Sequence, residues 1–179
     1  MTATSPKDIV KMFVFAIIPN LFIYRLLVWL PSSNANFFEF VPLDGFALFF
    51  LVTHYGLFVI TPFFVPTIES GRLFIRQNIL ALPLLIGSAF IVRRLHLPPP
   101  FQLPLTGTSS FHVVWAFSAA MALLKSRNTI RVPAAIWAVL VALGCLTAGL
   151  QTLFEIIVGL LIFIITFFVA TKIAARQFD

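Results

Sequence analysis

The sequence is poor in charged residues. Only 10% of its 179 residues are Asp, Glu, Lys or Arg, whereas 60% are hydrophobic, and the mean hydropathy is +1.05. A soluble globular domain carries about 25% charged residues, which it needs to cover its surface. The composition therefore excludes a water-soluble globular protein and predicts an integral membrane protein. The length predicts a single transmembrane domain over residues 1–179.

Cysteine is nearly absent, and so are the common cofactor motifs. The lone Cys145 lies in an apolar run and can form no internal disulfide. Cysteine and histidine do not cluster with the spacing of metal ligands, and a glycine-rich phosphate loop is missing. We therefore expect no metal site and no cofactor. The net charge of +6 more often marks the cytoplasmic side of a membrane protein than a nucleic-acid interface, so we expect no nucleic-acid partner.

Long apolar runs predict an all-α bundle of six transmembrane helices. A spanning helix needs about 20 apolar residues, within a range of about 17–25. The third and fourth runs are short in their apolar part, which is tolerated in a helix inside a bundle. A tight turn near Gly149 must separate the last two runs. The predicted spans are residues 12–30, 45–64, 73–92, 110–124, 132–150 and 151–171.

Basic residues predict the orientation of these spans. With both termini in the cytoplasm, most Lys and Arg residues fall inside, and the first outer loop, 31–44, carries two acids and no Lys or Arg. This is the positive-inside pattern, and it suits a bacterial inner membrane. The basic residues placed inside are Lys7, Lys11, Arg72, Arg76, Lys125, Arg127, Arg131, Lys172 and Arg176.

Arg93 and Arg94 break this pattern, because they sit at the outer end of the third span. The same face receives His112 at the start of the fourth span, and Gln151 and Glu155 at the start of the sixth. Ordinary interfacial snorkelling would explain the two arginines. The alternative is a site for an anion at the outer membrane surface.

The start of the fourth span has the chemistry of a phosphate site. Thr108, Ser109 and Ser110 are suitable N-cap residues, and a helix N-terminus offers free N–H groups and a positive dipole end. His112 would lie in that first turn, where an imidazole can act as a general acid near neutral pH. The candidate ligand-binding set consists of Arg93, Arg94, Ser109 and Ser110. A structural role for His112 as a cap or interfacial residue stays open.

The order of these motifs resembles the type-2 phosphatidic acid phosphatase superfamily. Members of that family have six spanning helices and three motifs on one membrane face. The second motif, P-S-x-H, is matched by "SSFH", in which Ser109 replaces the proline and His112 matches the histidine. The first motif, K-x6-R-P, is not found, and "RRLHLPPP", which begins at Arg93, occupies its place.

The third motif, S-R-x5-H-x3-D, is degenerate in this chain. Its serine and arginine become Gly144 and Cys145, its nucleophilic histidine becomes Gln151, and Glu155 stands in place of the aspartate. The resemblance implies that His112 would be the general acid and Glu155 the residue that orients the nucleophile. Because an amide is a poor nucleophile, the family fold can persist without its standard reaction.

These observations favour a pseudoenzyme, a non-catalytic lipid-binding protein or accessory subunit of a larger membrane assembly. Its partners would be membrane lipids, including a lipid phosphate head group. Two alternatives remain. One is an active phosphatase or phosphotransferase on phospholipid or polyprenyl phosphates. The other is a subunit of a bioenergetic complex in which His54 and His112, on different spans, ligate a haem or a chlorophyll-type pigment.

Overall fold

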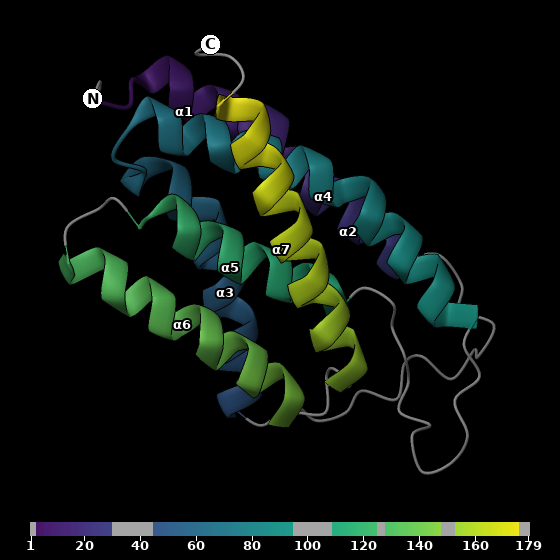
Figure 1. The fold of residues 1–179 in the computed structure, drawn as a ribbon. Coiled ribbons are helices and arrows are strands. Elements are labelled where there is room, and N and C mark those ends of the chain that lie inside the picture. Colours follow the sequence, from purple (N-terminus) through teal and green to yellow (C-terminus); the bar gives the residue numbers. More distant parts are fainter. Residues whose placement is uncertain (1–2, 30–44, 95–108, 125–127, 148–152, 176–179) are drawn as a thin grey trace.

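The computed structural model describes residues 3–29, 45–94, 109–124, 128–147 and 153–175, which are almost entirely helical and contain no strand. Figure 1 shows these helices as one bundle. The elements are α1 (Pro6–Met12), the π-helical turn η1 (Phe13–Ile17), α2 (Ile18–Trp29), α3 (Gly45–Phe64), α4 (Ile68–Arg94), α5 (Ser109–Ala122), α6 (Asn128–Thr147) and α7 (Leu153–Ala175).

The first three elements form one continuous helical run that begins at a capping box. The Ser5 hydroxyl accepts a hydrogen bond from the Asp8 backbone N–H, the Asp8 carboxylate accepts one from the Ser5 N–H, and Pro6 occupies the first helical position. Both features are typical of a helix start. The Thr4 hydroxyl donates to the Val65 carbonyl at 2.7 Å, which ties this start to the connection between α3 and α4.

Helix α5 is the central helix of the bundle. It packs against α3, α4, α6 and α7, and Figure 1 shows it between α6 on one side and α4 and α7 on the other. From Phe111 to Leu123, only Phe117 and Met121 are not fully buried. A helix with hydrophobic residues on all sides is typically buried. The segment "FHVVWAFSAAMALL" has hydrophobic residues on every face, which agrees with the central position of α5. With 14 residues, α5 is about 21 Å long, shorter than a bilayer core of about 30 Å.

The outer surface of the bundle is apolar. On α7, exposed side chains include Phe154, Leu161, Ile165 and Phe168, while Glu155, on the inward side, is buried. Water-soluble proteins rarely expose apolar patches of this extent. Among the described residues, three helical stretches are long and apolar enough to cross a membrane, and these are Pro6–Leu27, Ile68–Ile91 and Leu153–Ala175. These long apolar helices indicate a membrane protein.

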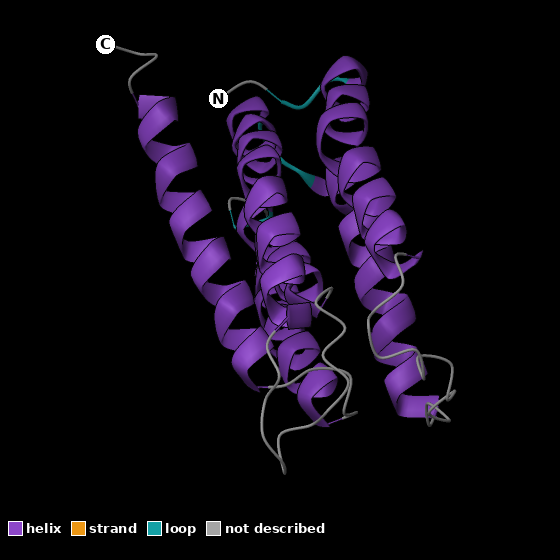
Figure 2. Cartoon of the chain, turned by 90° about the vertical axis from the view of Figure 1, so that its right-hand side faces the viewer, coloured by secondary structure: helices purple, strands orange, loops and turns teal. Residues whose placement is uncertain are grey.

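Three further apolar helices are shorter, and these are Tyr55–Phe64, Phe111–Ala122 and Thr129–Cys145. Two views show that the start of α1 and the end of α7 lie at one end of the bundle (Figure 1, Figure 2). The end of α4 and the starts of α5 and α7 lie toward the opposite end (Figure 1).

A helix lies at each predicted run. Helix α3 has the predicted bounds, residues 45–64, whereas the other helices begin or end at different residues. Helix α4 starts at Ile68, earlier than the predicted residue 73, because the Thr67 hydroxyl accepts a hydrogen bond from the Ser70 N–H at 3.2 Å and caps the helix. Gln77 and Asn78, two polar residues within the third predicted run, are buried in α4. The turn expected near Gly149 lies outside the described residues.

Candidate functional site

His112 lies in the first turn of α5 and is only 6% exposed. Its Nε2 is 3.3 Å from the Tyr24 hydroxyl oxygen of α2, within hydrogen-bond distance. The Tyr24 and Tyr55 rings pack edge-on against the imidazole, with ring centroids 5.3 and 5.7 Å away. The imidazole is therefore enclosed by residues from two other helices.

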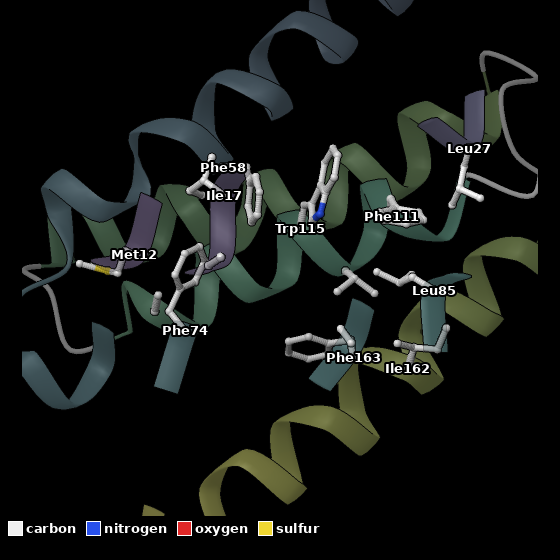
Figure 3. Packing of buried hydrophobic residues seen from close by; sticks show 14 of the residues in the cluster. Met12, Ile17, Leu27, Phe58, Phe74, Leu85, Phe111, Trp115, Ile162 and Phe163 are labelled. Carbon is white, nitrogen blue, oxygen red and sulfur yellow. The ribbon is translucent and has the colours of Figure 1, made fainter. Parts of the chain in front are cut away.

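Trp115 lies one turn after His112 and extends the same cluster. Its indole ring stacks on Phe58 of α3 at 4.9 Å with an interplanar angle of 12°, and Figure 3 shows the indole between Phe58 and Phe111. Its Nε1 donates a hydrogen bond to Oδ1 of Asn20 at 3.1 Å. Asn20, fully buried on α2, donates from Nδ2 to the Ala16 carbonyl at 2.9 Å.

We call Asn20, Tyr24, Tyr55, His112 and Trp115 the aromatic core. Its members come from α2, α3 and α5, and its polar atoms form two hydrogen bonds between α2 and α5. A buried polar group costs free energy unless it is hydrogen-bonded, and hydrogen bonds between helices stabilise packing inside membranes. The aromatic core therefore fixes α2 and α3 against the central helix.

A second buried polar contact joins α4 to the same face of α5. Nδ2 of Asn78 donates to the Phe74 carbonyl at 2.9 Å and approaches the Ser118 hydroxyl at 3.4 Å. The Ser118 hydroxyl in turn donates to the Trp115 carbonyl at 3.2 Å. Within the described part of the chain, the buried Gln77 Nε2 and Asn78 Oδ1 atoms have no hydrogen-bond partner. Helix α5 thus presents a polar residue every three positions, at 112, 115 and 118.

Glu155 is the third residue of α7 and is 1% exposed. The free N–H groups and the positive dipole end of a helix N-terminus favour a carboxylate there, by about 0.3–1 kcal/mol for surface positions. Since α5 and α7 pack together, both predicted catalytic positions, His112 and Glu155, lie in the first turns of two packed helices. In the described part of the chain, the rings of Tyr24, Tyr55 and Trp115 pack against His112.

The backbone places the other predicted site residues at helix ends. Arg93 and Arg94 are the last two residues of α4, and Ser109 and Ser110 are the first two of α5. The side chains of these four residues and of His54, and the whole of Gln151, lie outside the described residues. For the predicted anion site, the structure therefore describes only the helix ends on which these residues lie.

Sequence reasoning missed Tyr24, Tyr55 and Asn20. The chain has only two tyrosines, and both contact His112. Their phenol groups in otherwise apolar spans were an available signal, because a buried tyrosine hydroxyl usually finds a hydrogen-bond partner. Asn20, in the middle of the first apolar run, was a second signal, since polar groups within a span commonly face the bundle interior.

Comparison with protein-family models, curated proteins and solved structures finds no match for this chain. The resemblance to the phosphatidic acid phosphatase superfamily therefore rests on motif positions in the sequence alone. Across the ranges that the structure describes, no three His, Cys, Asp or Glu side chains gather as potential metal ligands.

Proposed function

We propose that this protein is a six-span integral membrane protein with a phosphatase-like order of helices that does not turn over phosphate. It would serve as a lipid-binding accessory subunit of a larger membrane assembly. The observation that carries the proposal is the enclosure of His112. A general acid must reach the oxygen of a leaving group, whereas this imidazole is buried and faces Tyr24 and Tyr55.

The third motif supports the same proposal. A phosphatase of this kind needs an attacking imidazole, and Gln151 occupies that position in the sequence. Loss of a covalent nucleophile removes the chemical route and leaves binding intact. Arg93, Arg94, Ser109 and Ser110 would then serve to hold a lipid phosphate head group at the outer surface.

The proposed topology puts six helices across a bacterial inner membrane with both termini in the cytoplasm. The apolar outer surface of the bundle supports immersion in lipid. The common end shared by the start of α1 and the end of α7 (Figure 1) supports an even number of crossings. Helix α5 can be shorter than the hydrocarbon core of the bilayer, because other helices and not lipid surround it.

Phosphate release tests the proposal. Wild type, His112→Ala and Glu155→Gln would be purified in detergent and incubated with phosphatidic acid and with a polyprenyl phosphate. We expect background release from all three proteins. Release by wild type that disappears in His112→Ala would refute the proposal and favour the active phosphatase. The absorbance spectrum of the same preparation tests the haem or pigment alternative, for which we expect no Soret or pigment band.

A further inference from the structure

An apolar groove of about 750 Å³ lies between α3 and α6, lined mainly by one stripe of side chains from each helix. On α3 the stripe includes Phe49, Gly56, Ile60 and Phe64, which recur at the spacing of one helix face. At one end of the groove, the rings of Phe49 and Trp137 meet edge-on at 5.8 Å and join α3 to α6. The groove is therefore bounded at that end by an aromatic contact.

The dimensions of the groove suit a single alkyl chain. Phe49 and Phe64 are 15 positions apart, which is about 22 Å at 1.5 Å per residue. Dividing the volume of about 750 Å³ by this length gives a mean cross-section of roughly 34 Å². The groove is thus long and narrow, a shape that an extended alkyl chain can follow.

Glycine widens the groove at its middle. A Cβ built on Gly56 would meet no atom within 4 Å, so the surface is hollow beside this residue. Pro133 and Ala134 on the facing side of α6 also have short side chains. In a protein surrounded by lipid, lipid chains can enter a hollow of this kind from the side.

Positive charge lies beside the other end of the groove. Thr129 and Ile130 line the groove at the start of α6, and Arg131 follows directly. On the helix surface, Arg131 neighbours Ala134, which also lines the groove. An arginine matches a phosphate in charge and hydrogen-bond geometry. Arg131 flanks the groove and does not line it, so a lipid with its head group at this end would have a basic side chain beside the phosphate.

We propose that the groove between α3 and α6 binds one acyl chain of an anionic phospholipid, with Arg131 beside the phosphate. This site is separate from the predicted head-group site near His112, because Arg131 lies at the start of α6, toward the opposite end of the bundle from the start of α5 (Figure 1). The inference rests on the proposed immersion in a bilayer. It does not depend on the absence of phosphatase activity.

Filling the groove tests the site. Gly56→Phe would place a ring in the hollow without a clash at Cβ, and Gly56→Leu is a smaller variant for the same position. Gly87→Phe is the matched control, because Gly87 is also helical, lies on α4 away from the groove, and also has open space at Cβ. Each protein would be reconstituted in nanodiscs of equal parts phosphatidylglycerol and phosphatidylcholine, and the lipid retained after release into detergent would be measured by native mass spectrometry.

We expect wild type and Gly87→Phe to retain one phosphatidylglycerol. Gly56→Phe should retain at least about tenfold less, a change of 1.4 kcal/mol in binding. Arg131→Gln should lower the preference for phosphatidylglycerol over phosphatidylcholine about fivefold, since one basic residue near the head groups contributes about 1 kcal/mol. Equal retention by Gly56→Phe and Gly87→Phe would overturn the site. A wild-type dimer that Gly56→Phe dissociates would overturn it too, by showing that a second copy covers the groove.

The same preparations separate this inference from the proposed function. Carbonate washing of membranes tests immersion, because a peripheral protein is released and an integral one is not. An integral protein that retains no lipid in the groove would contradict only the groove inference. Phosphate release by wild type would contradict only the proposal that the protein lacks phosphatase activity.

Discussion

The Tyr24 hydroxyl oxygen lies 3.3 Å from Nε2 of His112, although the two residues are 88 positions apart in the sequence. This contact joins the first helical run to the central helix α5. It gives the single histidine of the "SSFH" motif a partner inside the bundle. The contact is the basis for reading His112 as part of the protein's interior.

Tyr24→Phe should destabilise the protein modestly without changing its fold. The substitution removes the hydroxyl and keeps the ring that packs on His112 and Trp115. A net hydrogen bond contributes about 0.5–1.5 kcal/mol, and hydrogen bonds between membrane helices average about 0.6 kcal/mol. We therefore expect a loss of this order in the free energy of unfolding, measured by SDS titration in mixed micelles. Unchanged stability would show that the contact contributes nothing.

Asn20 and Trp115 should be energetically coupled. The Trp115 indole N–H donates to Asn20 at 3.1 Å, so Trp115→Phe and Asn20→Ala each break the same bond. The double variant should then lose less stability than the two single losses added together, with a coupling of about 0.6–1.7 kcal/mol. Strict additivity in the SDS titration would contradict this pairing. Ile136→Ala, at an exposed position of α6, provides the surface control.

The all-helical class and the approximate places of the helices in the described residues could be predicted from the sequence, because hydropathy over about 20 residues detects long apolar helices. The first residue of each helix was harder to predict. The capping box at Ser5 and the cap at Thr67 start α1 and α4 among polar residues that a hydropathy window excludes. Local hydrogen bonds, and not hydropathy, decide those bounds.

The environment of His112 could not be read from the sequence. Its position at a helix start was predicted, and α5 does begin at Ser109. Its neighbours depend on how α2 and α3 pack around α5, and pairs such as Tyr24 and His112 follow no local periodicity. The arginines near the predicted anion site were chosen by topology alone, so their contacts with a ligand stay a prediction.

The two ends of the protein should be on the same side of the membrane. In a Cys145→Ala background, Lys7→Cys and Lys172→Cys place single thiols at exposed positions on α1 and α7. Six crossings predict that a membrane-impermeant maleimide labels both thiols only when the cytoplasmic face is open. If only the three long helices crossed the membrane, the two thiols would lie on opposite sides. That labelling pattern would contradict the six-span topology.

Chemical modification of His112 tests the central claim most directly. Diethyl pyrocarbonate would be applied to the folded protein in detergent, to protein unfolded in SDS, and to Tyr24→Ala, and the peptide containing His112 would be quantified by mass spectrometry. An imidazole enclosed in the aromatic core predicts little modification in the folded wild type, more in Tyr24→Ala, and full modification after unfolding. If folded wild type were modified as fast as the unfolded protein, His112 would be open to reagents, as a catalytic acid must be, and the claim that it is enclosed would be wrong.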